Sequence, residues 1–223
     1  MALLLLAFVL AARADTITLT DGTRLTGTVA RITAGEIIVN GQAPVAGSNA
    51  SLVVFSAPDV LPYSAGVMLT DGTTLGGAVR SMKPDGVLFR SVALGELTIP
   101  TNLVALVYFD APPAPADVKA PPAGAWQAIF KNGITKDGTL VVLSALSAVL
   151  RTADGLEKIP LDQLTRLVRA TPATQAAVVL RNRDRFDSPA SWNGTNLTVR
   201  IGTQTFPIGL NTLREVRWAE RNR

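Results

Sequence analysis

The chain has 223 residues, of which 48% are hydrophobic and 17% charged, so it has the composition of a folded protein of one or two domains. It contains no His and no Cys, which excludes a Ser-His-Asp or Cys-His catalytic arrangement, disulfides, and zinc sites of the usual kinds. The net charge of +4 is unevenly distributed, because residues 121–223 hold 14 of the 21 Lys and Arg but only 8 of the 17 Asp and Glu.

The first segment of the chain is apolar from Met1 to Leu10 and continues as Ala11-Ala-Arg-Ala14 before the polar Asp15. This pattern is typical of a secretory signal peptide, so residues 1–14 are predicted to be a signal peptide cleaved after Ala14. The alternative is a buried N-terminal strand, because no Lys or Arg precedes the apolar run. The run is too short to span a bilayer, and no membrane span is expected elsewhere. The lack of Cys favours a bacterial periplasmic or extracellular protein.

The next feature is a repeated turn. Leu19-Thr-Asp-Gly-Thr23 recurs as Leu69-Thr-Asp-Gly-Thr73, and apolar residues alternate with polar ones on both sides of each Asp-Gly. Asp-Gly between alternating runs predicts a β-hairpin, because Gly tolerates a positive φ. In the second segment, further strands and a tight turn follow, up to Phe109. The chain is therefore predicted to contain tandem units of about fifty residues, each built from short strands.

Two weaker copies follow in the second half. The third keeps a turn at Asn132-Gly133 and has Gly138 where the second copy has Gly77, whereas the fourth has Arg183 in place of the turn glycine and Ser188 in place of the second glycine. Proline-rich stretches separate the copies. The stretch between the second and third copies is expected to be an extended spacer, or alternatively a ligand for a groove-type domain. The predicted division is repeat 1 (15–57), repeat 2 (66–110), a Pro-rich linker (111–124), repeat 3 (125–170) and repeat 4 (176–223).

The opening of each copy resembles the first sequence motif of the Sm and Sm-like family. The pattern reads Ile17-x-Leu19-x-Asp21-Gly22-x-x-Leu25-x-Gly27, and it occurs again from Val67 to Gly77. The resemblance implies an all-β fold of about four tandem five-stranded barrels of SH3 or Sm type. Because a unit of about fifty residues is marginal alone, the barrels are expected to pack in pairs. The second Sm motif and the RNA-contacting residues of the first have no counterpart here, so RNA binding is not implied. The whole chain also resembles Asp-Gly repeat segments of exported bacterial proteins, which implies compartment and architecture only.

Four residues of the basic half form the candidate ligand site. Arg181, Arg183 and Arg185 would project from one face if they lie on a strand, where they could bind phosphate, an acidic glycan or a lipid head group. Trp192 lies in a polar stretch and could stack on a sugar ring. The alternatives are a charged edge that prevents strand-to-strand aggregation and a Trp packed in the core. Asp21 and Asp71 are interpreted as turn residues and not as catalytic or calcium-binding groups.

These observations predict a non-enzymatic exported β-repeat protein that acts as a structural or protein-interaction scaffold. The alternative is a binding module for an anionic glycan or envelope polymer, using the basic C-terminal half. A hydrolase based on two carboxylates is a third and less favoured hypothesis. No catalytic residue, cofactor or metal ion is expected, and the modest charge does not favour a nucleic-acid partner.

Overall fold

The computed structural model describes residues 14–122, 124–174, 176–187 and 189–218. This part of the chain is all-β, as predicted, with 22 strands and five 3₁₀ turns of three residues each. Within it, no helix has the length and apolarity needed to cross a membrane. Residues 1–13 of the predicted signal peptide lie outside the described residues.

Copies 2 and 3 have a long, unbroken second strand. The strands of copy 2 are β7 (Gly66–Leu69), β8 (Thr74–Lys83), β9 (Gly86–Ser91), β10 (Gly95–Ile99) and β11 (Val104–Tyr108). Those of copy 3 are β12 (Trp126–Phe130), β13 (Thr135–Ser144), β14 (Ser147–Thr152), β15 (Gly155–Pro160) and β16 (Leu164–Val168). A 3₁₀ turn precedes the last strand of each copy, at Thr101–Leu103 and at Leu161–Gln163.

In copies 1 and 4 the second strand is divided in two. Copy 1 consists of β1 (Asp15–Leu19), β2 (Arg24–Gly27), β3 (Val29–Ile32), β4 (Glu36–Val39), β5 (Val45–Ala46) and β6 (Ala50–Val54). Copy 4 consists of β17 (Val178–Leu180), β18 (Arg185–Phe186), β19 (Pro189–Asn193), β20 (Asn196–Ile201), β21 (Gln204–Gly209) and β22 (Leu213–Arg217). Because of this break, β3–β5 and β19–β21 form two separate three-stranded sheets.

The same strand pairing recurs in all four copies. In each, the last strand pairs antiparallel with the first, and a bulge follows the pair of residues nearest the turn. These pairs are Leu19 with Ala50, Leu69 with Val104, Phe130 with Leu164, and Leu180 with Leu213. A shared bulge fixes which residues are equivalent between copies, and this equivalence supports the comparisons below.

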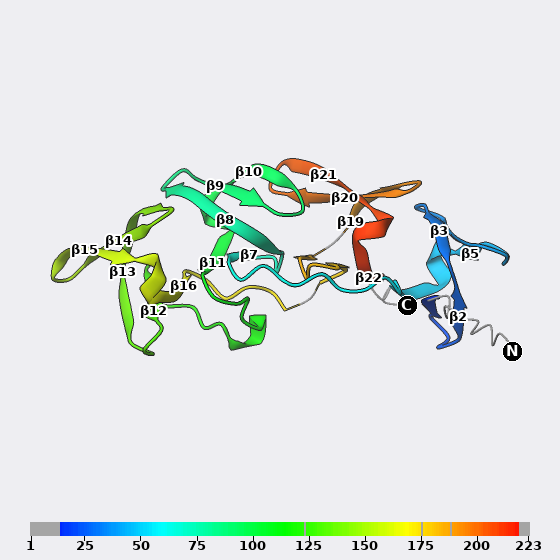
Figure 1. The fold of residues 1–223 in the computed structure, drawn as a ribbon, viewed down its shortest axis with the longest axis horizontal. Coiled ribbons are helices and arrows are strands. Elements are labelled where there is room, and N and C mark those ends of the chain that lie inside the picture. Colours follow the sequence, from blue (N-terminus) through cyan, green and yellow to red (C-terminus); the bar gives the residue numbers. More distant parts are fainter. Residues whose placement is uncertain (1–13, 123, 175, 188, 219–223) are drawn as a thin grey trace, which may run out of the picture.

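The copies join by pairing equivalent strands. The last strands of copies 2 and 3 pair with each other, with Val107 opposite Leu167, and those of copies 1 and 4 pair with Val53 opposite Val216. Two further contacts join second strands: β8 pairs with β18, with Thr74 opposite Arg185, and also with β13, with Met82 opposite Leu143. The copies therefore lie in the spatial order 3-2-4-1 along the long axis (Figure 1). Below, copies 2 and 3 are called pair 2–3, and copies 1 and 4 are called pair 1–4.

The prediction of four separate barrels is not confirmed. The first and last strands of all four copies belong to one 16-stranded sheet that is not a barrel, ordered β15-β14-β13-β12-β16-β11-β7-β8-β18-β17-β22-β6-β1-β2, with β9 paired to β8 and β10 paired to β9. The physical reason is that each last strand has a free backbone edge, and pairing it with an equivalent strand satisfies its N–H and C=O groups.

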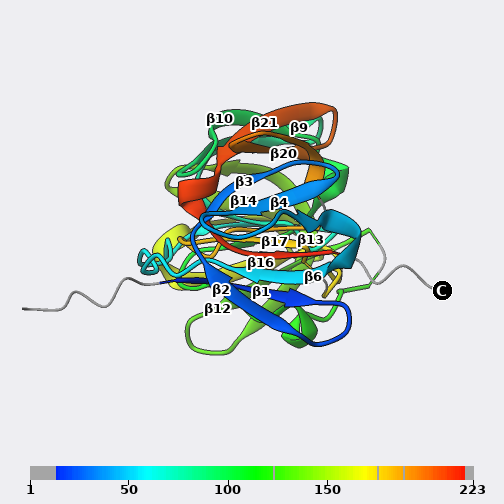
Figure 2. The ribbon, with the colours of Figure 1, turned by 90° about the vertical axis from the view of Figure 1, so that its right-hand side faces the viewer.

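The core lies between two layers. Viewed along the long axis, β3, β4, β9, β10, β20 and β21 lie above the first and last strands of the main sheet (Figure 2). Alternate residues of the main sheet point into this space and are fully buried, as Ile17, Val53 and Leu167 show. The remaining residues of the main sheet point away from that core, toward what is called the outer face below.

The Pro-rich linker differs from the expected spacer. Residues 115–117 form a 3₁₀ turn in which Pro115 is buried, and Val118 is also buried. Val118 belongs to a second hydrophobic cluster together with Met68, Leu106, Tyr108 and Val168. The linker therefore covers the outer face of pair 2–3, and it runs beneath the sheet in Figure 1.

Candidate functional site

The outer face of pair 1–4 carries an open groove of about 680 Å³. Its floor is a row of directly opposed residues, with Val179 of β17 between Arg185 of β18 and Glu215 of β22. Opposed residues of an antiparallel sheet project to the same side, so these side chains share the outer face. The hollow is called the arginine groove here, and its charged and aromatic lining consists of Arg183, Arg185, Asp187, Arg214, Glu215, Arg217 and Trp218.

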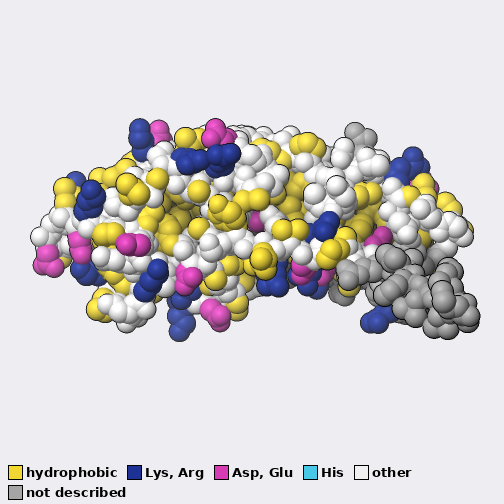
Figure 3. Space-filling view, in the orientation of Figure 1, with side chains coloured by type: hydrophobic (Ala, Val, Ile, Leu, Met, Phe, Trp, Pro, Cys, Tyr) yellow, Lys and Arg dark blue, Asp and Glu magenta, His cyan; other side chains and the backbone are white. Residues whose placement is uncertain are grey.

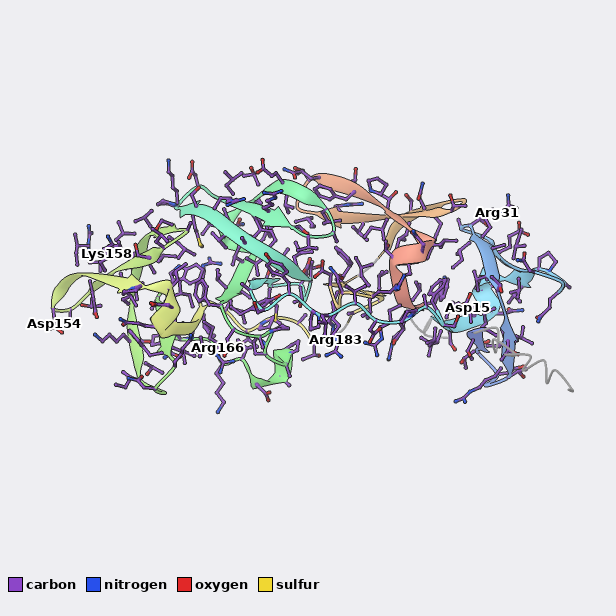
Figure 4. The ribbon with its side chains drawn as sticks, viewed as in Figure 1. Asp15, Arg31, Asp154, Lys158, Arg166 and Arg183 are labelled. Atoms are coloured by element: carbon purple, nitrogen blue, oxygen red, sulfur yellow. The ribbon has the colours of Figure 1, made fainter. Side chains whose placement is uncertain are left out.

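Arg183 lies at the rim of the groove because of the turn that holds it. Its φ of 68° is the only positive φ of a non-glycine residue in the described part of the chain. The turn glycines of the other copies, Gly22, Gly72 and Gly133, have φ values of 87°, 91° and 83°. The prediction that Arg183 replaces the turn glycine is therefore consistent with the backbone. Arg183 is exposed, and Figure 4 shows it on the lower side of the ribbon.

Arg185 lies deeper in the groove. It is half-buried, its Nη2 donates to the carbonyl of Thr174 at 3.4 Å, and its Nε is buried without a hydrogen-bond partner among the described residues. A guanidinium group has five N–H donors, and only one hydrogen bond of the Arg185 guanidinium is found among the described residues, so it can donate further hydrogen bonds to an oxygen of a ligand. Arg185 thus provides the most specific polar feature of the groove floor.

Sequence reasoning did not identify Arg214 and Arg217, which also line the groove. Arg214 forms an ion pair with Asp59 at 3.0 Å, and Arg217 contacts Glu215. Alternation on the last strand could have indicated that Glu215 and Arg217 share a face, but the strand's partner across the sheet could not be known from the sequence.

Arg181 does not line the groove, in contrast to the predicted cluster of three arginines. Its Nε donates to the carbonyl of Pro58 at 2.7 Å, and its Nη1 donates to the carbonyl of Asn211 at 2.9 Å. Its backbone carbonyl also accepts from the N–H of Val60. Arg181 therefore fixes the segment between copies 1 and 2 against copy 4.

Trp192 is half-buried and stacks on Trp218, with ring centroids 6.1 Å apart and an interplanar angle of 10°. Both rings pack against the main hydrophobic core. Trp218, not Trp192, lines the groove. The Trp pair therefore forms one end of the site, and Trp192 supports the ring that a ligand would touch.

The acidic residues limit the positive charge of the groove. Burial and the nearby charge of Asp71 raise the pKa of the Asp187 carboxyl. With Arg214 and Arg217 next to carboxylates, Arg183 and Arg185 are the groove arginines for which no ion pair to a described carboxylate is found. Charges of both signs are mixed over the long side of the molecule seen in Figure 3.

Asp184 is a buried carboxylate at the contact between copies 2 and 4. It is 2% exposed, its Oδ1 accepts from the N–H of Gly76 at 2.6 Å, and its Oδ2 has no hydrogen-bond partner in the described part of the chain. Burial raises the pKa of Asp184 to about 6, although the hydrogen bonds from Gly76 and Asn182 act to lower it. Burial and the charge of Asp184 likewise raise the pKa of the Tyr108 phenol.

A second hollow of about 540 Å³ lies between copies 1 and 4 and includes Asp15. The carboxylate of Asp15 accepts hydrogen bonds from the N–H groups of Val29 and Ser56 at 2.9 and 2.8 Å, which gives it a structural role in copy 1. Among the residues described, no group of three or more Asp and Glu side chains could hold a metal ion.

Comparison of the chain with protein-family models, with curated proteins and with solved structures found no match.

Proposed function

We propose that this protein is a non-enzymatic, exported scaffold that binds a partner protein on the outer face of pair 1–4. The observation that carries the proposal is the continuous main sheet, in which four contacts between equivalent strands hold four copies in one array. Such an array presents a long fixed surface, and one part of that surface, the arginine groove, remains open. Open grooves on rigid sheets are common sites of partner binding.

We further propose that each copy is an SH3- or Sm-like unit that does not form a separate barrel but shares a sheet with its neighbours. The recurring pairing of first and last strands, the shared bulge and the 3₁₀ turn before the last strand support this assignment. A unit of about fifty residues buries too little surface to be stable alone, so pairing with another copy would stabilise it.

Export rests on the apolar N-terminal segment. Asp15 begins β1, and its side chain is already hydrogen-bonded within copy 1. Cleavage after Ala14 would therefore leave the hydrogen bonds of the Asp15 side chain in place. Mass spectrometry of the protein from its producing organism tests this: a mature chain that starts at Asp15 is expected, and a retained Met1 would contradict export through this segment.

The alternative proposal is that the arginine groove binds an anionic glycan or envelope polymer, which the same basic residues would favour. A carboxylate hydrolase receives less support, because Asp184 lies at the contact between copies 2 and 4 and does not line the groove.

A photoreactive amino acid placed at Asp187, which is exposed at the groove, tests the scaffold proposal. The matched control carries it at Leu88, which is 41% exposed on β9 in the other layer. We expect irradiation of producing cells to link one identified protein to position 187 and not to position 88. Cross-linking to saccharide alone would favour the glycan alternative, and equal cross-linking from both positions would contradict a specific partner site.

A further inference from the structure

The covered face of pair 2–3 shows how a segment can lie on the face that is open in pair 1–4. In pair 2–3, the linker lies against the outer face, with Pro115 and Val118 buried. The backbone on either side of the 3₁₀ turn is extended, with φ and ψ of −63° and 134° at Ala114 and of −96° and 116° at Val118. An extended proline-containing segment can therefore lie across this surface of a paired unit.

The same face in pair 1–4 has different side chains at equivalent positions. The register places Arg217 where copy 3 has Val168, and Thr18 where copy 2 has Met68. Val54, at the position of the buried Tyr108, is 37% exposed. The face of pair 2–3 is thus mostly apolar, with Arg166 opposite Tyr108 as a charged member. The face of pair 1–4 has Glu215 at the position of Arg166 and a second charged residue, Arg217, at the position of Val168.

The charges indicate what the open face selects. Arg183 and Arg185 are the groove arginines for which no described carboxylate forms an ion pair, and the Arg185 guanidinium makes one hydrogen bond, to the carbonyl of Thr174. Acidic side chains of a ligand would form charge-assisted hydrogen bonds with both groups. Val179 and the ring of Trp218 offer apolar contact beside them.

We propose that the arginine groove binds an extended, proline-containing acidic segment of the partner protein, in the manner in which pair 2–3 binds the linker. This inference rests on the proposed scaffold function and names the chemistry of its partner. Carboxylates of the segment pair with Arg183 and Arg185, and proline or aliphatic side chains lie on Val179 and Trp218. The sequence after Trp218 has two Arg and one Glu, so its charge does not complement the groove.

The chain supplies its own probe. The peptide of residues 111–122 with Ala116→Glu and Lys119→Glu keeps the prolines and Asp117 and adds acidic groups. The neutral version carries Ala116→Gln, Asp117→Asn and Lys119→Gln, so it has the same length, the same prolines and nearly the same side-chain shapes as the acidic peptide and differs from it in charge. Both peptides carry a fluorophore, and anisotropy reports their binding to the chain of residues 15–223 at low and at high salt.

The groove variant combines Arg183→Gly with Arg185→Gln, which removes the two arginines proposed to bind the carboxylates. Glycine suits the positive φ at position 183, so this variant is expected to fold. The matched control is Arg200→Gln, which removes an exposed arginine of β20 outside the groove. Far-ultraviolet circular dichroism and thermal unfolding verify that both variants are folded.

We expect the acidic peptide to bind at low salt, the groove variant to bind it about tenfold more weakly, which corresponds to about 1.4 kcal/mol, and Arg200→Gln to bind it unchanged. The neutral peptide should bind at least about fivefold more weakly than the acidic one.

Equal affinity for the acidic and neutral peptides, or for the groove variant and the wild type, would overturn the inference. Salt-sensitive binding of an acidic polysaccharide such as polygalacturonate, without binding of the peptide, would also overturn it and favour the glycan alternative. If neither peptide binds while position 187 cross-links to one protein, the inference fails and the scaffold function stands; if both experiments fail, both proposals fail.

Discussion

Pair 2–3 and pair 1–4 have the same strand pairing, but the outer face is covered in pair 2–3 and open in pair 1–4. In pair 2–3, Met68, Leu106 and Val168 form an apolar face that the chain covers with its own linker. In pair 1–4, arginines and half-buried residues occupy the corresponding face, and it remains open. The comparison shows that the side chains on alternate positions of the first and last strands decide whether a sheet face becomes a second core or a surface for a partner.

The largest expected difference between the two faces is in stability. Leu106 is fully buried on the covered face, whereas its equivalent Leu52 is half-buried on the open face. Leu106→Ala is expected to lower the free energy of unfolding by about 3 kcal/mol, and Leu52→Ala by about 1 kcal/mol, because fewer contacts are lost. Urea unfolding of both variants measures this. Equal losses would show that the two faces do not differ as described.

The contact between the pairs should depend on pH through Asp184. Because the pKa of Asp184 is about 6 in the folded protein and 3.8 in the reference state, the folded protein binds the proton more tightly. The contribution of Asp184 to the free energy of unfolding should therefore be greatest below about pH 4. It should fall as the pH rises to about 6, by roughly 3 kcal/mol in total.

Asp184→Asn keeps an oxygen for the N–H of Gly76 and removes the titration, so the difference in stability between wild type and variant should change over this pH range. Urea unfolding at several pH values measures the difference. A constant difference between pH 4 and pH 7 would contradict the burial of a titrating carboxyl at this contact.

A smaller effect is expected at the turn that distinguishes copy 4. Arg183→Gly should raise the free energy of unfolding by about 1 kcal/mol, because a side chain in the left-handed region is unfavourable. The matched change Gly133→Arg, at an exposed turn with φ of 83°, should lower it by a similar amount. Thermal unfolding compares the two. If both changes shift the melting temperature in the same direction, the two turns are not equivalent.

The sequence was sufficient to predict the all-β class and the turns. Alternation around Asp21-Gly22 and Asp71-Gly72 is a local signal, and the same is true of the replaced glycine at Arg183. The pairing of copy 1 with copy 4 has no such signal, because it depends on which strand edges meet after folding. The separate barrels were predicted from local pattern alone, and the free edges of β6, β11, β16 and β22 joined them into one sheet instead.

The candidate site was predicted in part for the same reason. Arg183 and Arg185 line the groove, but Arg181 binds the carbonyls of Pro58 and Asn211, which are distant in sequence. Arg214, Arg217 and Trp218 reach the groove only because β22 pairs with β17. The role of the linker could not be predicted either, because a proline-rich composition does not indicate that Val118 packs against the outer face of pair 2–3.

The central claim is that copies 1 and 4 pair with each other and leave their outer face open. The chain has no Cys, so a disulfide can test it directly. Val54 and Glu215 are opposite each other on β6 and β22, and directly opposed residues of antiparallel strands are generally close enough for a disulfide. The control pairs Val54→Cys with Arg166→Cys, because Arg166 is the residue of copy 3 equivalent to Glu215.

After mild oxidation of the monomer, the variant with Val54→Cys and Glu215→Cys should lose the mass of two hydrogens and become resistant to alkylation, while the control keeps two free thiols. A disulfide in the control, or free thiols in both proteins, would contradict the 3-2-4-1 order of the copies.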